Sequence, residues 1–123
     1  MSTLDKINNK AILKESVKYL ESQGYKNIRA EIDGYQTPTK YHRVGSDVHI
    51  GPDIEADLGG HKHYFEIGVR PEKPQQLKSK WEFLERVSKS RHYQFKVITR
   101  RGHYKFTQDM LDALHIDRNP IKL

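Results

Sequence analysis

The chain has 123 residues, a formal net charge of +6 and no cysteine, and its mean hydropathy is −0.88. A chain without cysteine has no disulfide scaffold, zinc–thiolate site or cysteine nucleophile, and no run of about 18 apolar residues is present to cross a membrane. The length suits one domain over residues 1–123 with its own buried core. The opening MSTLDKINNK lacks an apolar signal core, so we expect a cytoplasmic protein.

Hydrophobic spacing and turn residues predict the elements in chain order. They are a helix over 4–23, strands over 25–32, 48–58 and 61–69, a helix after Pro74, a strand over 93–99, and a last helix with Thr107 as its N-cap. The Gly59–Gly60 turn predicts an antiparallel hairpin, and the helix after Pro74 predicts a parallel right-handed crossover. The expected fold class is α/β, a mixed central sheet flanked by helices.

Charge patterning gives the first indication of function. The basic balance favours polyanionic partners such as DNA, although a solubilising surface is an equally simple explanation. The segment from Asp47 to Glu66 is locally acidic within this basic chain. Acidic residues clustered within a basic chain predict a divalent-cation site next to a bound phosphate backbone.

Two adjacent predicted strands carry the candidate chemistry. Alternate residues of a strand share a face, which groups Asp53, Glu55 and Asp57 on one strand. It likewise groups Glu66 with Arg70 on the next strand. If the hairpin forms, these rows can point the same way and bind Mg²⁺ or Mn²⁺ through oxygen ligands, and such a metal activates water and stabilises phosphoryl charge. The simpler alternative is an ordinary hairpin with acidic residues facing solvent.

The order of elements and the motif Pro52–Asp53 followed by Glu66 resemble the PD-(D/E)XK nuclease superfamily, and within it the archaeal Holliday-junction resolvases. The resemblance covers about 85 residues in order and spacing. It implies a restriction-endonuclease-like αβββαβ core, here followed by a C-terminal helix. It also implies metal ligation by Asp53 and Glu66, with Asp57 supporting. Glu15 lies where many members carry a further acidic residue, and a homodimer is common among these resolvases.

One position departs from the superfamily pattern. The motif lysine is replaced by Gly68, and glycine can neither orient water nor stabilise charge. Arg70 lies on the same strand face and could hold phosphate, but arginine is a poor base. Lys73, Lys78 and Lys80 could reach the site from the next helix or its approach. A lysine at position 68 would project onto the face of Glu66, so Gly68→Lys is expected to raise cleavage if activity is feeble.

Further residues are candidates for binding. Basic residues in two loops and near the second helix are expected to contact DNA: Lys40, Arg43, Lys73, Lys78, Arg100, Arg101 and Lys105. His61 and His63 have the i, i+2 spacing of strand metal ligands, but a hairpin tip commonly exposes histidines. Trp81 lies on an apolar helical stripe and is expected in the core.

Three functions remain open at this point. The first is a metal-dependent DNA endonuclease in which Glu15, Asp53, Glu66 and Arg70 are catalytic. The second is a catalytically inactive nuclease-fold module that binds nucleic acid or a protein partner. The third is a plain interaction module, which would bind neither metal nor DNA in a salt-dependent way.

Overall fold

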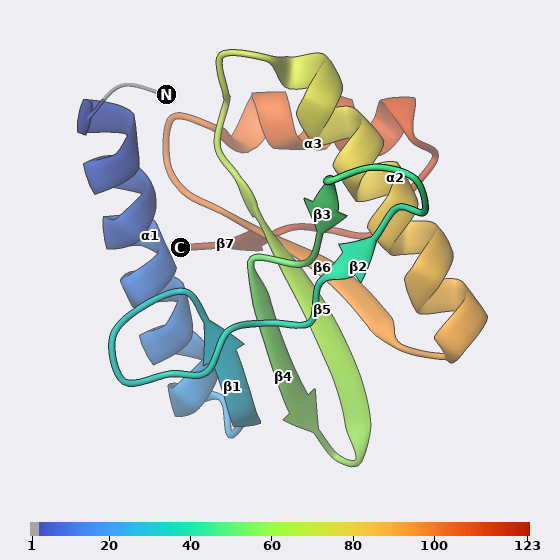
Figure 1. Cartoon of the computed structure of the whole chain (residues 1–123). Coiled ribbons are helices and arrows are strands. Elements are labelled where there is room, and N and C mark those ends of the chain that lie inside the picture. Colours follow the sequence, from blue (N-terminus) through green and yellow to red (C-terminus); the bar gives the residue numbers. More distant parts are fainter. Residues whose placement is uncertain (1–2) are drawn as a thin grey trace.

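The computed structural model describes the backbone of residues 3–123 and the side chains of residues 9–123. Helix α1 (Thr3–Ser22) is followed by strands β1 (Lys26–Ala30), β2 (Tyr41–His42), β3 (His49–Ile50), β4 (Ile54–Leu58) and β5 (His61–Gly68). Helix α2 (Pro74–Arg91), strand β6 (Gln94–Thr99), helix α3 (Tyr104–Ala113) and strand β7 (Ile121–Lys122) complete the chain (Figure 1). No helix in this described part is long and apolar enough to cross a membrane.

The central sheet is mixed, as the sequence predicts. Its strand order is β1-β4-β5-β6-β7. The β1–β4 and β4–β5 pairs are antiparallel, and the β5–β6 and β6–β7 pairs are parallel. The β4–β5 hairpin and the β5–α2–β6 crossover are both confirmed. The α/β architecture of a mixed sheet flanked by helices is therefore confirmed.

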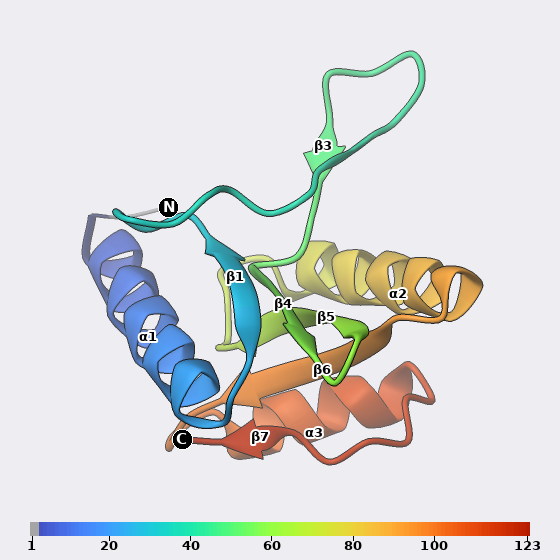
Figure 2. The same ribbon diagram turned by 90° about the horizontal axis from the view of Figure 1, so that it is seen from below.

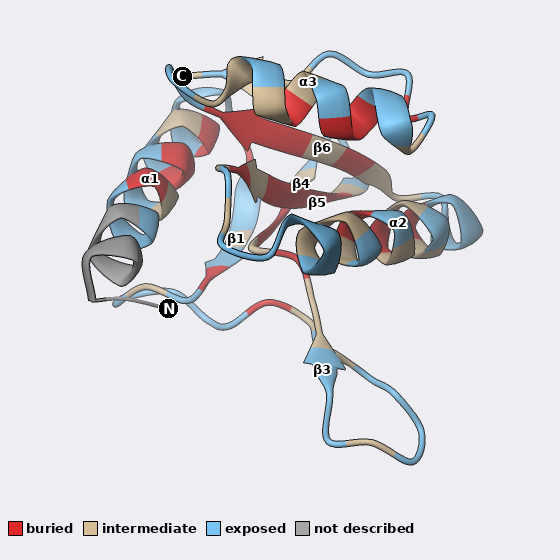
Figure 3. Ribbon diagram, turned by 90° about the horizontal axis from the view of Figure 1, so that it is seen from above, coloured by how far each residue is buried: buried red, intermediate tan, exposed pale blue. Residues whose placement is uncertain are grey.

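Helices cover both faces of this sheet. Helix α1 packs Val17 and Leu20 on the face that carries Phe65 and Ile98. Helices α2 and α3 pack on the opposite face, where Trp81 is fully buried as predicted. Figure 3 shows these buried residues concentrated between the sheet and the helices.

The predicted strand over 48–58 is divided in two. The short strands β2 and β3 form a separate hairpin that projects from the body of the molecule (Figure 2). The chain is irregular at Gly51 and Pro52 and bends at Asp53 before β4 begins. A Cβ atom at Gly51 would lie 2.1 Å from the carbonyl oxygen of Thr39, so only glycine permits this close approach of two chain segments. The period-two pattern cannot reveal such a tertiary contact.

Two expectations near the C-terminus differ from the structure. Thr107 is not an N-cap, because α3 begins at Tyr104 and Thr107 is buried within the helix. Strand β7 was not predicted because it has two residues, too few for an alternating pattern. Residues Ile121 and Lys122 pair with Ile98 and Thr99 of β6 and extend the sheet.

Candidate active site

Asp53 and Glu66 lie side by side where β4 begins and β5 nears its end. The backbone N–H of Asp53 donates to Oε2 of Glu66 at 2.9 Å. In return, the backbone N–H of Ile67 donates to Oδ2 of Asp53 at 2.9 Å. Each carboxylate is thus anchored by the other strand through one of its oxygens. The second oxygen of each remains directed to a common point.

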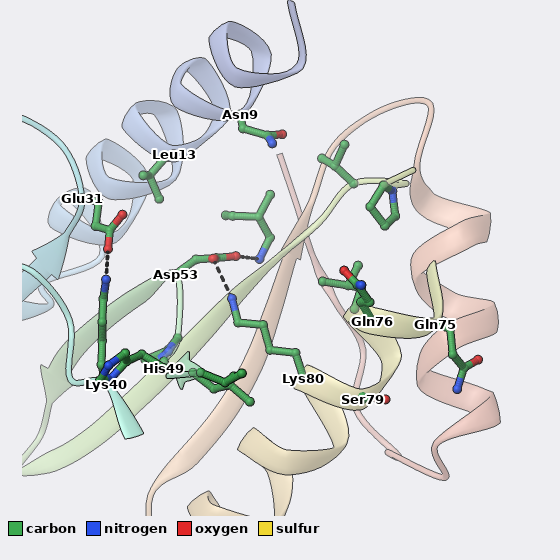
Figure 4. A pocket seen from close by; sticks show the side chains of 18 residues that line it. Asn9, Leu13, Glu31, Lys40, His49, Asp53, Gln75, Gln76, Ser79 and Lys80 are labelled. Carbon is green, nitrogen blue, oxygen red and sulfur yellow. Dashed lines mark hydrogen bonds and ion pairs between the residues drawn. The ribbon is translucent and has the colours of Figure 1, made fainter. Parts of the chain in front are cut away.

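Lys80 occupies that common point. Its Nζ lies 3.1 Å from Oδ1 of Asp53 and 3.1 Å from Oε1 of Glu66. It comes from the second turn of α2, on the face of the helix next to the start of β4 (Figure 4). Of the three lysines that the sequence offers as substitutes for the motif lysine, the structure brings Lys80 to the carboxylates.

The electrostatics of this cluster are unbalanced. Two carboxylates face one ammonium group, and the side chain of Glu66 is fully buried. Burial and the neighbouring charge of Asp53 raise the pKa of Glu66 well above its usual range. Burial alone would lower the pKa of Lys80, but Asp53 and Glu66 more than offset it and the net shift is upward. Lys80 is therefore a permanent cation in a site with an excess of acid.

The structure explains why no lysine occupies position 68. A Cβ atom at Gly68 would lie 2.4 Å from Oγ1 and 2.9 Å from Cγ2 of Thr107 on α3. Thr107 is fully buried, and its hydroxyl oxygen lies within hydrogen-bond distance of the Gly68 carbonyl oxygen, at 3.1 Å, and of Thr99 Oγ1, at 3.0 Å. The structure does not favour a lysine at position 68, because the Thr107 side chain fills the space that its Cβ atom would need, and the effect of Gly68→Lys on cleavage stays a prediction.

A cavity opens beside Asp53, whereas the buried Glu66 does not line it. It has a volume of about 860 Å³ and is lined by Asp53, Lys80, both flanks of the β2–β3 hairpin, and α1. From α1 it receives Asn9 and Leu13, and Figure 4 shows Asn9 directed into it. We call this space the Asp53 cavity. Its position between a sheet end and two helices is typical of a ligand site.

The other predicted catalytic and metal residues lie apart from this pair. Glu15 is on the exposed face of α1 and does not line the Asp53 cavity. Asp57 lies four residues along β4, about 13 Å away by strand rise, and accepts a 3.0 Å hydrogen bond from Asn27 Nδ2. Arg70 lies beyond the end of β5, with its guanidinium 5.2 Å from the centre of the Phe106 ring.

The predicted DNA-contacting residues separate into distinct groups. Lys40 lines the Asp53 cavity, where it pairs with Glu31 at 2.7 Å. Arg43 is exposed in the projecting hairpin, and Lys105 pairs with Asp109 at 3.1 Å on the outer side of α3. The remaining four are Lys73 and Arg100, which line a second cavity, and Lys78 and Arg101, which line neither.

The histidine pair does not make a metal site. His61 is exposed at the hairpin, whereas His63 is buried against the rings of Tyr25 and Phe65. Within the described side chains, no group of three or more histidine or acidic residues is placed to hold a metal ion. A site built on Asp53 and Glu66 thus has two protein carboxylates.

Asn9 is among the cavity residues that sequence reasoning missed. Asn9 lies one helical turn before Leu13, so both face the same side of α1. The one available signal was this spacing, but Asn9 is polar and precedes the apolar stripe from which the helix was predicted.

Comparison of the chain with protein-family models, curated proteins and solved structures finds no match.

Proposed function

We propose that the protein is a metal-dependent DNA endonuclease in which Asp53, Glu66 and Lys80 form the active centre. The observation that carries this proposal is the position of Lys80 Nζ, 3.1 Å from a carboxylate oxygen of each acidic residue. These are the three residue types of the PD-(D/E)XK motif that the sequence resembles, with the lysine supplied by α2 in place of β5. The α/β sheet and the αβββαβ order of α1, β1, β4, β5, α2 and β6 support the same proposal.

The donor set fits a small divalent cation. Mg²⁺ in proteins is commonly bound by one or two carboxylates together with water and substrate phosphate. Asp53 and Glu66 provide two such groups, against the single ammonium group of Lys80. When bound, the cation would stabilise negative charge on the phosphoryl oxygens and make bound water more acidic.

The residues of the chain have separate roles in this proposal. Asp53 and Glu66 would hold the cation, and their mutual backbone hydrogen bonds keep both carboxylates in place before it binds. Lys80 is charged, so it is suited to orient water and to stabilise charge on the phosphoryl group rather than to accept a proton. Asn9 could donate a hydrogen bond to substrate from the other wall of the cavity.

The test is cleavage of linear, branched and supercoiled DNA with Mg²⁺ and with chelator. Asp53→Asn and Glu66→Gln should each reduce cleavage by at least about 100-fold, since each removes charge that holds the cation. Glu31→Gln, at the edge of the same cavity, is the matched acidic control and should retain cleavage. Undiminished cleavage by Asp53→Asn, or no cleavage by the wild type on any substrate, would overturn the proposal.

A second candidate is a nuclease-fold module that binds DNA without cutting it. The ammonium of Lys80 already lies within 3.1 Å of an oxygen of each carboxyl group and supplies one compensating charge without a metal. This function predicts DNA binding that is unchanged by Mg²⁺ and unaffected by Asp53→Asn.

A further inference from the structure

A second cavity adjoins the Asp53 cavity and is strongly basic. It has a volume of about 920 Å³, and its charged lining comprises four cations and one carboxylate, together with His103. The cations are Arg70, Lys73, Lys80 and Arg100, and the carboxylate is Glu72. We call this space the basic cavity. Lys80 lines both cavities. A polyanion that extends from the carboxylate pair into the basic cavity therefore meets a concentration of positive charge.

Three of the four cations of the basic cavity have no ion pair in the described part of the chain, whereas the fourth, Lys80, pairs with Asp53 and Glu66. Residues 9–123 supply no ion pair to Arg70, Lys73 or Arg100, although they pair Lys62, Arg86, Lys89 and Lys105 elsewhere on the surface. Unpaired cations gathered in a concave surface carry a solvation cost that an anion can offset. Cations without an ion pair also occur elsewhere in the described part of the chain, Arg101 among them, so this cavity is distinguished by the gathering of three such cations around one concave space.

Two loops are tied together at the mouth of the basic cavity. The backbone N–H of Arg70, after β5, donates to Nδ1 of His103, after β6, at 3.1 Å. Because Nδ1 accepts this bond, a neutral His103 carries its proton on Nε2 as a donor. The Arg70 guanidinium is held over the Phe106 ring at 5.2 Å from its centre, which limits its freedom before any ligand binds. The donors of the cavity are thus partly preorganised.

We propose that the basic cavity is a phosphate subsite that holds the DNA phosphate next to the scissile one. This inference rests on the proposed function, because the carboxylate pair and Lys80 define where the scissile phosphate lies. Successive phosphates of one strand would lie on either side of Lys80, one over the carboxylates and the next among Arg70, Lys73 and Arg100. The subsite would position the strand and contribute affinity without reading bases.

Adjacent arginines provide a matched pair of variants. Arg100 lines the basic cavity, whereas Arg101 is equally exposed, one residue further on, and lines neither this cavity nor the Asp53 cavity. A general attraction of DNA to positive charge would make both contribute alike. If the basic cavity is a specific subsite, substitution of Arg100 should weaken binding much more than substitution of Arg101. Both variants change a solvent-exposed side chain.

The first measurement titrates inorganic phosphate, without metal, into isotopically labelled wild type, Arg100→Gln and Arg101→Gln, followed by backbone amide NMR. Phosphate should shift the amides of Arg70 and of residues 100–103 in the wild type and in Arg101→Gln, and the shifts should be lost in Arg100→Gln. Shifts of similar size in both variants, or an adventitious scatter over all basic residues, would overturn the subsite.

The second measurement follows DNA binding against salt concentration in the presence of chelator. Arg100→Gln should weaken binding about tenfold and lower the slope of log K against log salt by about one, while Arg101→Gln should weaken binding less than about threefold. Equal effects of the two variants would refute the proposal. Because neither measurement needs cleavage, the two failures are distinguishable: phosphate and DNA binding at Arg100 in a protein that cuts nothing would refute the nuclease and leave the basic cavity as a phosphate site with no scissile phosphate beside it.

Discussion

Two buried glutamates on neighbouring strands make an instructive contrast. Glu55 on β4 and Glu66 on β5 are 2% and 0% exposed. Glu55 has one lysine to itself, Lys62 at 3.0 Å, and also accepts a hydrogen bond from the Thr39 backbone N–H at 3.0 Å. Glu66 shares its lysine with a second carboxylate, that of Asp53.

The pKa shifts of the two glutamates have opposite directions. Burial alone would raise the pKa of Glu55, but its hydrogen bonds from Thr39 and Lys62 more than offset this and leave it below the usual value. Burial and Asp53 raise the pKa of Glu66. The Glu55–Lys62 pair has one carboxylate for one ammonium group, whereas the Asp53–Glu66–Lys80 cluster has two carboxyl groups for one ammonium group. A cation bound to the cluster would favour the ionised form of Glu66. Perturbed groups of this second kind are concentrated at functional sites.

The largest expected effect is on catalysis by the shared lysine. Lys80→Met should slow Mg²⁺-dependent cleavage by at least about 100-fold, because it removes a fixed positive charge next to the reacting phosphoryl group. Lys89→Met, on the same helix and in a surface pair with Glu85, is the matched control and should cleave within about threefold of the wild type. Circular dichroism would verify that both variants are folded. Equal rates for the two variants would refute the role of Lys80.

The contrast also predicts opposite changes in stability. In the metal-free protein at pH 8, Glu55→Gln should lower the free energy of unfolding by about 1–3 kcal/mol, since it disrupts a neutral, fully bonded pair. Glu66→Gln should leave that free energy unchanged or raise it, because it leaves Lys80 and Asp53 as a one-to-one pair. Urea denaturation would measure both variants, and destabilisation of equal size would remove the distinction between the two glutamates.

The pH dependence of the Glu66 effect has a definite sign. A carboxyl group whose folded pKa is raised stabilises the protein at low pH, and this contribution is lost as pH rises through the folded pKa. The advantage of Glu66→Gln over the wild type should therefore shrink between pH 8 and pH 5. An advantage that grows on acidification would contradict the raised pKa.

Position 68 bears on the Glu66 cluster, because it is the place on β5 from which the superfamily lysine would come, whereas here Lys80 comes from α2. Gly68→Ala should destabilise the protein by about 1–3 kcal/mol, since the new methyl group meets the buried Thr107 side chain. Thr107→Ala removes both atoms that the new methyl group would strike. Thermal denaturation of the single and double variants should give a double variant that is more stable than the sum of the single effects predicts. Strict additivity would contradict a direct clash.

His63 tests burial without a charged partner and has the smallest expected effect. Burial lowers its pKa, so it stabilises the fold above its unfolded pKa of about 6.5 and this contribution is lost as pH falls. The free energy of unfolding should therefore fall between pH 7 and pH 5.5 through this residue. In His63→Phe, measured by urea denaturation at each pH, that part of the drop should disappear. An unchanged pH profile would place the acid sensitivity elsewhere.

The sequence predicts the scaffold better than the site. Alternation in β4 and β5 and the stripe of α2 are local patterns, so the hairpin, the crossover and the buried Trp81 could be read from residue spacing. The choice of Lys80 among three nearby lysines could not, because it depends on how α2 is rotated against the sheet. The closed space at Gly68 is likewise set by Thr107, 39 residues further along the chain.

The central claim is that Asp53 and Glu66 together bind one cation, whereas Glu55 takes no part in that site. Isothermal titration of Mg²⁺ into the wild type, Asp53→Asn, Glu66→Gln and Glu55→Gln tests it most directly. The account predicts one site per chain in the wild type and in Glu55→Gln, and none in the other two variants. Absence of Mg²⁺ binding by the wild type, or binding that survives in Asp53→Asn, would contradict it.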